Sequence, residues 1–162
     1  MNQLTSGYGR ALSGKRAMES FDDSPRDKLT LVSAISLNGL FAECEFKGSM
    51  DKARFEIYSR DILIPTLKSG DTLLMDNLSS HKSKEVKELF KEKGINILYL
   101  PPYTPEYNPI EMMWAKIKSF LRKNRSKDIL QLKENITKAF SLVNIDDIKG
   151  WFNHCGYPCT LN

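Results

Sequence analysis

The sequence has no long hydrophobic run, no paired-cysteine motif and no large excess of charge of one sign. No apolar stretch approaches the roughly 18 residues that span a bilayer, and the N-terminus lacks the pattern of a secretory signal. We therefore expect a cytoplasmic protein with no membrane partner. Apolar residues make up 41% and charged residues 27%, which is far from the composition of disordered chains and predicts a folded core.

Cysteine is scarce, and its positions exclude two classes of protein. Cys44, Cys155 and Cys159 are an odd number without CxxC spacing, so they predict neither a disulfide framework nor a zinc knuckle. His154 beside two of them lacks a fourth partner at a standard spacing, and we interpret this group as core packing with reduced thiols. The net charge of +4 gives only weak support for a nucleic-acid partner.

At 162 residues the chain fits one domain, and its patterns predict an α/β fold. Residues 1–27 show no apolar period, and we interpret them as loop. Residues 29–35 and 40–46 predict a β-hairpin around Asn38-Gly39. A helix follows, with Asp51 as its cap and Pro65 limiting its end.

The next elements predict a parallel strand, helix, strand unit. Residues 72–75 and 95–100 are the strands, and the helix between them is capped by Ser80 or Ser83 and ends at Gly94. Four prolines make residues 101–109 a stiff loop.

Two periodic helices follow this loop, and the tail WFNHCGY is expected to pack against them. The first helix begins at Ile110 and the second presents a separate apolar face. Their predicted core-facing residues are Met113, Trp114, Ile117, Phe120, Leu121, Leu132, Ile136, Ala139, Phe140 and Val143.

Two carboxylates could carry chemistry. Asp76 ends a predicted buried strand, and ligands of α/β folds bind beyond the carboxyl ends of parallel strands. Glu111 stands at a helix start, where Asn108 and Pro109 suit the cap and first turn, so a capping box is a purely structural explanation for it. Together the two acids could hold Mg²⁺ or Mn²⁺, which prefer oxygen ligands.

Basic residues follow Glu111 without an intervening acid as far as Asp128. They could neutralise phosphates of DNA, although a solvated helix face is the alternative. His81 could orient a carboxylate or a water, or line the helix start. The candidate DNA-binding residues are Lys116, Lys118, Arg122, Lys123 and Arg125, continued by Lys127.

Two segments resemble a known family. MDNLSSHKS around Asp76 and LPPYTPEYNPIEMMWAKIKSFLRK around Glu111 resemble the second and third acidic motifs of mariner-type bacterial insertion-sequence transposases, which carry a DDE superfamily endonuclease domain. The 34 residues between the two acids match the family's spacing, and the likeness runs from about Gly7 to Tyr157.

This resemblance implies a ribonuclease-H-like mixed sheet flanked by helices. In it, two metal ions bind three carboxylates, a water cleaves transposon-end DNA, and the freed 3′-hydroxyl attacks target DNA. Asp76 and Glu111 would be metal ligands, with Asn77, His81 and Asn108 as supporting residues. The implied partners are transposon-end and target DNA, and a second copy or a full-length transposase.

The family's first Asp and its central strand would precede Met1, and so would its DNA-reading helix-turn-helix. Asp22 and Asp23 follow the segment GYGRALSGKR and do not replace that Asp. We therefore expect an incomplete two-metal site, inactivity of the chain alone, and two unpaired sheet edges that invite pairing with another chain. The alternatives are a noncatalytic DNA-binding or subunit-interaction regulator of a full-length transposase, or a start codon that lies upstream.

Overall fold

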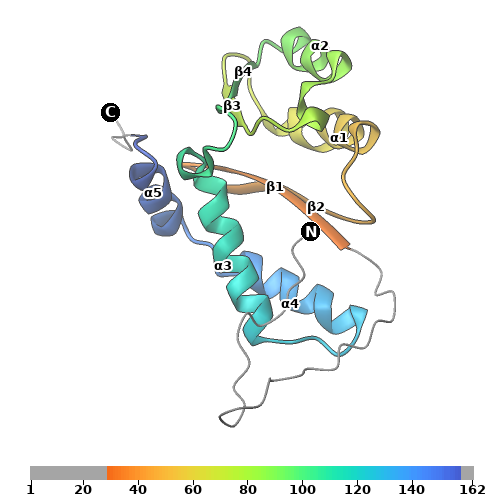
Figure 1. Ribbon diagram of the computed structural model, residues 1–162, viewed down its shortest axis with the longest axis vertical. Coiled ribbons are helices and arrows are strands. Elements are labelled where there is room, and N and C mark those ends of the chain that lie inside the picture. Colours follow the sequence, from red (N-terminus) through yellow and green to blue (C-terminus); the bar gives the residue numbers. More distant parts are fainter. Residues whose placement is uncertain (1–28, 158–162) are drawn as a thin grey trace, which may run out of the picture.

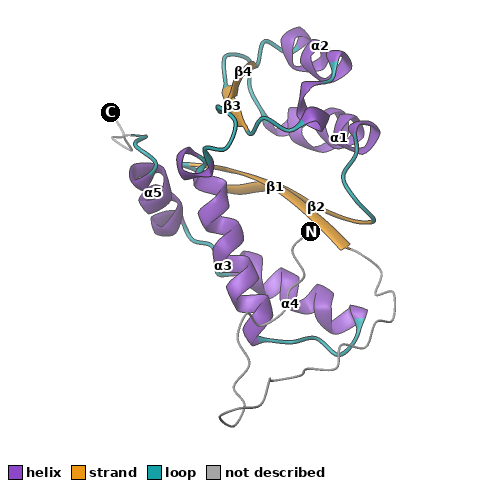
Figure 2. Ribbon diagram, in the orientation of Figure 1, coloured by secondary structure: helices purple, strands orange, loops and turns teal. Residues whose placement is uncertain are grey.

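The computed structural model describes residues 29–157, so the predicted loop at residues 1–27 and Cys159 lie outside the described range. Figures 1 and 2 show the arrangement of the elements. Within this range no helix is long and apolar enough to cross a membrane. In chain order the strands and α-helices are β1 (Leu29–Ser36), β2 (Gly39–Lys47), α1 (Lys52–Tyr58), β3 (Thr72–Met75), α2 (Lys84–Glu92), β4 (Asn96–Tyr99), α3 (Pro109–Lys123), α4 (Ile129–Ser141) and α5 (Ile145–His154).

The predicted hairpin is present, with a turn one residue earlier than expected. β1 pairs antiparallel with β2 from Leu29 opposite Lys47 to Ser36 opposite Gly39. The turn residues are therefore Leu37 and Asn38, while Gly39 begins the second strand at φ +135°. Glycine suits that position because a side chain is strained at positive φ.

A bulge interrupts the hairpin in β2. Val32 pairs with Cys44 and Ala34 pairs with Phe41, so two residues of β2 oppose a single residue of β1. Ala42, in the bulge, has φ +55°, and the buried hydroxyl of Tyr58 donates to its carbonyl oxygen at 2.8 Å. Helix α1 thereby fixes the carbonyl that the bulge removes from the ladder.

The hairpin separates two apolar cores, one on each face. Val32 and Ala34 pack with Phe55, Met75 and Phe90 from α1, β3 and α2. On the other face, the core is formed by α3 and α4 with side chains of both strands. Its members from these elements include Leu31, Ile35, Leu40, Met113, Ile117, Leu121, Ile136 and Ala139. Figure 1 shows α1 and α3 on opposite sides of the hairpin.

Local capping signals explain the helices on the first face. Asp51 accepts from the backbone N–H of Arg54 at 2.9 Å and begins α1. The helix continues through a wider π-helical turn at Ser59–Leu63 and a tighter 3-10 turn at Ile64–Thr66, to the region of Pro65. Of the two candidate caps of α2, Ser83 is the cap, because its hydroxyl accepts from the N–H of Val86. The chain then reverses at Gly94, with φ +69°.

β3 and β4 form the predicted parallel unit, but the two sheets do not join. β3 pairs only with β4, and β1 only with β2, within residues 29–157. The expected mixed sheet is therefore present as two ribbons of two strands. Among the described residues each of the four strands has one unpaired edge, so the two edges that the sequence predicted are not the only ones.

The C-terminal region contains a third helix that periodicity did not predict. The tail WFNHCGY belongs largely to α5, which begins at a capping box formed by Asn144 and Asp147. As expected, it packs against the preceding helices, since Trp151 joins the α3 and α4 core. Lys116 of α3 binds both Asp147 and the carbonyl of Leu142, which ties α3 to the start of α5.

We expect the change Tyr58→Phe to lower the free energy of unfolding by about 1–3 kcal/mol, because it leaves the buried Ala42 carbonyl without its donor. Burial raises the pKa of the Tyr58 hydroxyl, so it remains a donor across neutral pH. Urea unfolding followed by tryptophan fluorescence measures the effect. In Tyr157→Phe, which removes a solvent-exposed hydroxyl bond to the Tyr107 carbonyl, the loss should be much smaller; equal losses would contradict the bulge argument.

Candidate active site

Asp76 lies where the β3 strand ends, at the mouth of a cleft between the two ribbons. The N–H of Leu100 donates to the Met75 carbonyl at 2.8 Å, so pairing with the β4 segment continues up to the residue before Asp76. The backbone N–H of Leu78 then donates to Oδ1 of Asp76 at 3.3 Å. The carboxylate is thus held at the carboxyl end of a parallel strand, as the sequence predicted.

His81 contacts this carboxylate. Its Nδ1 lies 2.7 Å from Oδ1 of Asp76, although the contact does not have the alignment of a hydrogen bond, so we describe it as a close polar contact. The His81 ring packs on Phe55 with centroids 4.2 Å apart, and Tyr99 donates to the His81 carbonyl at 2.7 Å. Both the ring and the backbone of His81 are therefore fixed.

Asp76 remains ionised more readily than an ordinary aspartate. Burial is the largest single influence and raises the pKa of its carboxyl, but the interaction with His81 and the N–H of Leu78 together outweigh it and hold the pKa below its ordinary value. The side chain is still 40% exposed. It is thus an anionic, accessible carboxylate at neutral pH.

Glu111 lies in the first turn of α3, and the capping-box explanation for it is wrong. Asn108 is the N-cap and Pro109 the first helical residue, as predicted, but no side-chain cap hydrogen bond forms. Only the backbone N–H of Glu111 bonds to Asn108, at 3.1 Å. Among the described residues, the exposed Glu111 carboxylate has no hydrogen bond or ion pair.

The cleft brings the predicted site residues together. Its volume is about 780 Å³, and Asp76, His81, Asn108 and Glu111 all line it. Its walls include residues of β1, the start of β2 and β3, and none of β4. Asn77, which follows Asp76, has a buried amide Oδ1 without a hydrogen-bond donor in residues 29–157.

The cleft holds two carboxylates that could contribute to a metal site. No group of three or more His, Cys, Asp or Glu side chains in residues 29–157 is arranged to hold a metal ion. Two carboxylates in one cleft can nevertheless offer hard oxygen ligands, which Mg²⁺ and Mn²⁺ prefer.

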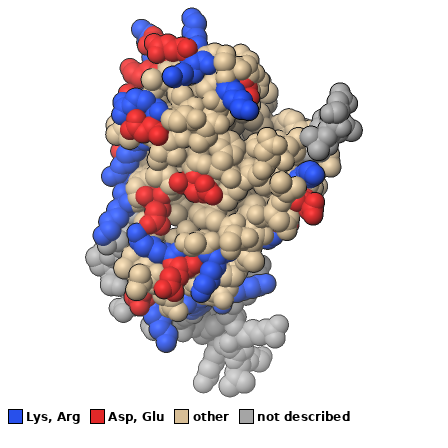
Figure 3. Space-filling view, turned by 180° about the vertical axis from the view of Figure 1, so that it is seen from behind, with Lys and Arg blue, Asp and Glu red and all other residues tan. Residues whose placement is uncertain are grey.

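The predicted basic residues divide by their position on α3. With 100° per residue, Lys118 and Arg122 lie on the same helix face as Glu111, while Lys123 turns further round. Lys116 is held by Asp147 and Leu142 and so has a structural role. Arg122, Lys123 and Arg125 are exposed. On the back face, Figure 3 shows Lys and Arg interspersed with Asp and Glu along one border.

Two further features near the site were missed by sequence reasoning. Lys82 and Lys87 each place an ammonium group 5.7 Å from the centre of the Tyr99 ring. Tyr99 is the residue whose hydroxyl donates to the His81 carbonyl. Phe55, the ring beneath His81, comes from a helix 26 residues earlier. The lysines that follow Asp76 are visible in the sequence, whereas nothing in the sequence indicates that Phe55 stacks on His81.

The described residues thus form an α/β fold in which one carboxylate follows a parallel strand and a second begins a helix that carries basic residues. Residues 2–133 match the family of DDE superfamily endonucleases. The match covers most of the chain, which therefore belongs to this family.

Relatives of known sequence are transposases of nematodes. The chain is 34% identical over 68 residues to the Tcb2 transposase of Caenorhabditis briggsae, which is 42% of this chain and 25% of that protein. It is 30% identical over 76 residues to the Tc3 transposase of Caenorhabditis elegans, or 46% and 23%. The chain thus spans about a quarter of the length of these two relatives. Its predicted likeness to bacterial insertion sequences stays a prediction.

Solved structures confirm the ribonuclease-H-like fold. The catalytic domain of Mos1 mariner transposase has a TM-score of 0.67 at 17% identity, with 85% of this chain and 73% of that chain covered. The Mos1 paired-end complex with left transposon end has a TM-score of 0.70 at 15% identity, covering 91% and 46%. At these identities the likeness concerns the fold.

We expect the pKa of Asp76 in metal-free protein to lie below 3.8, its ordinary value, and to rise in His81→Ala, because burial still raises it once the lowering effect of the imidazole is removed. A ¹³C NMR titration of the carboxyl carbon in EDTA measures both. Since the folded pKa is the lower one, ionised Asp76 stabilises the fold above its ordinary pKa, and this contribution is lost as pH falls through the folded pKa. His154→Ala, on α5, is the control; an unchanged Asp76 titration in His81→Ala would contradict the assignment.

Proposed function

We propose that this chain carries two of the three carboxylates of a mariner/Tc1-type transposase active site, which cleaves transposon ends and joins them to target DNA. The observation that carries the proposal is the cleft shared by Asp76 and Glu111, in a chain of the DDE superfamily endonuclease family. The third carboxylate would come from a strand before Met1, as the family resemblance implied. The chain alone would then be inactive.

The donor set fits a divalent cation. Both described contacts of Asp76 fall on Oδ1, which leaves Oδ2 without a partner among the described residues, and Glu111 is likewise unengaged. Bound Mg²⁺ or Mn²⁺ would polarise a phosphodiester and activate a water as nucleophile. Related structures of the Mos1 catalytic domain were determined with raltegravir and Mg or Mn, which supports the choice of metal.

The residues of the chain would hold and orient the reactants. His81 and the N–H of Leu78 fix the Asp76 carboxylate, which would hold its second oxygen in a constant position for a ligand. Lys118 and Arg122 extend from Glu111 along one helix face and would neutralise phosphates on either side of the cleaved bond. Lys123 and Arg125 would continue this interaction at the end of α3, whereas Lys116 is held in the α3 to α5 interface.

A second candidate function is favoured by β1 and β3, which line the cleft and have one partner strand each among the described residues. A chain that takes up a strand from a full-length transposase could form mixed assemblies and regulate that enzyme without cleaving DNA. Edge pairing of this kind needs only backbone groups, so it does not depend on the carboxylates. The two candidates therefore separate in experiments that measure pairing and cleavage independently.

We expect labelled transposon-end DNA to be cleaved in Mn²⁺ only when the chain is supplied with an upstream fragment carrying the missing strand and its Asp. Asp76→Ala and Glu111→Ala should then abolish cleavage, because each removes a metal ligand, while Glu106→Ala, an exposed acid of the preceding loop, should retain it. Cleavage by the chain alone would show that no outside carboxylate is needed. A fragment that raises the melting temperature but never confers cleavage would favour the regulatory function.

We expect the double change Lys118→Ala and Arg122→Ala to make DNA binding less salt-dependent, lowering the slope of log K against log salt by about 0.9 for each phosphate that is no longer neutralised. Fluorescence anisotropy of a labelled duplex between 50 and 200 mM salt, roughly the range in which such interactions are screened, measures this slope. The control Lys133→Ala removes a lysine that is paired with Glu45 and should leave the slope unchanged. Equal slopes for the double variant and the unaltered chain would exclude this helix face from the interface.

A further inference from the structure

The loop between β4 and α3 holds one aromatic ring fully in solvent. The Tyr103 side chain is 99% exposed, and Tyr107 in the same loop is 50% exposed. Tyr103 also has φ +61°, in the left-handed region that bulky residues rarely occupy. Its backbone is therefore held in a strained conformation that keeps the ring outside the fold, and such strain marks functional loops.

The exposure does not arise from a slack loop. Pro101, Pro102 and Pro105 restrict the backbone on both sides of Tyr103. The hydroxyl of Thr104 closes the turn by donating to the Pro101 carbonyl at 2.7 Å. At the far end, Tyr157 from the segment after α5 donates to the Tyr107 carbonyl at 2.9 Å. The chain thus presents a rigid ring to solvent, where it contributes nothing to the core.

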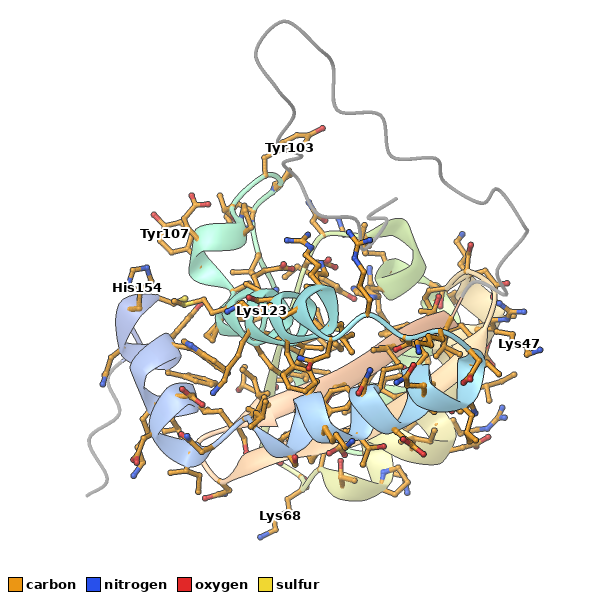
Figure 4. The ribbon with its side chains drawn as sticks, turned by 90° about the horizontal axis from the view of Figure 1, so that it is seen from below. Lys47, Lys68, Tyr103, Tyr107, Lys123 and His154 are labelled. Atoms are coloured by element: carbon orange, nitrogen blue, oxygen red, sulfur yellow. The ribbon has the colours of Figure 1, made fainter. Side chains whose placement is uncertain are left out.

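The loop joins the partner strand of the Asp76 strand to the helix that carries Glu111. It leaves β4 beside the strand that ends at Asp76, and it enters α3 just before Glu111. Its last residues, Asn108 and Pro109, line the cleft. Figure 4 shows that Tyr103 and Tyr107 project from the same end of the molecule, away from the body of the fold.

We propose that Tyr103, together with Tyr107, is a stacking platform for an unpaired base of the DNA strand engaged at the Asp76 and Glu111 cleft. This inference rests on the proposed function. A flat ring held in solvent offers the face that a nucleobase stacks on, and stacking tolerates any base. Lys118 and Arg122, on the helix that follows, would hold the phosphates of the same strand.

A nucleobase suits this surface better than a protein partner. Stable protein interfaces bury roughly 800 Å² on each side, and they centre on aromatic residues surrounded by packed neighbours. Here the neighbours of Tyr103 are exposed prolines and the acidic Glu106, without a broad apolar patch. A single base needs only the face of one ring.

The test uses single-stranded oligonucleotides with one 2-aminopurine, bound to the chain in EDTA so that no cleavage occurs. We expect Tyr103→Ala to weaken binding roughly fivefold to a hundredfold and to abolish quenching of the 2-aminopurine. Tyr103→Phe should retain both, and Tyr103→Leu neither. Ile57→Ala, which alters an exposed residue of α1, should bind and quench like the unaltered chain.

Three results would overturn the inference. If Tyr103→Leu binds and quenches as well as Tyr103→Phe, the ring acts as an apolar surface and not by stacking. If the unaltered chain binds DNA without quenching at any probe position, no base stacks there. If it binds no DNA, no base stacks on Tyr103 and the inference fails. Cleavage assays in Mn²⁺ with the supplied strand report the proposed function separately, so none of these three failures overturns it.

Discussion

The β1 and β2 hairpin separates two apolar cores, and the position of the site depends on this separation. One face of the ribbon packs on α1, α2 and β3, and the other packs on α3 and α4. The strand that ends at Asp76 packs in the first core, and the helix that carries Glu111 packs in the second. The carboxylates meet in one cleft because both cores share the same two strands, so damage to the hairpin would displace the acids relative to each other.

A two-stranded ribbon is marginally stable without support, and this fold contains two of them. Each strand has one free edge, and β1 and β3 both line the cleft that also holds the carboxylates. A strand placed there would satisfy backbone groups of both ribbons and would exclude water from Asp76. Pairing and chemistry would then be coupled, because the group that completes the sheet also lowers the dielectric around the site. This coupling explains why stability and cleavage are best measured on the same complex.

Features encoded by neighbouring residues could be predicted from the sequence. Asp51 and Ser83 are helix caps, Gly94 ends a helix, and the strand before Asp76 has the predicted bounds, because each signal acts between residues that are close in the chain. The two carboxylates were assigned to one site by resemblance, and the cleft that they share agrees with it. Their role as metal ligands stays a prediction.

What could not be predicted depends on interactions between distant residues. The bulge at Ala42 is fixed by a hydroxyl 16 residues away, and Lys116 is bound by Asp147, 31 residues away. The same basic run that suggested DNA binding therefore contains a residue with a structural role. The prediction of a capping box at Glu111 was wrong although its residues are close in the chain. The local pattern is present, but the side chains do not form the hydrogen bonds. A sequence pattern states which bonds are available, while packing decides which of them form.

The two carboxylates differ in how far their side chains are fixed by the protein before any ligand binds. Asp76 is held by His81 and by a backbone N–H, so its side-chain entropy is lost on folding. Glu111 has no partner in the described range, and ordering a long side chain on binding costs about 0.5–1.5 kcal/mol. The metal affinity of the completed site would therefore be limited by Glu111 and by the incoming strand, with Asp76 as the fixed reference. A site built in this way assembles only when every contributor is present, which would keep an isolated chain from cleaving DNA.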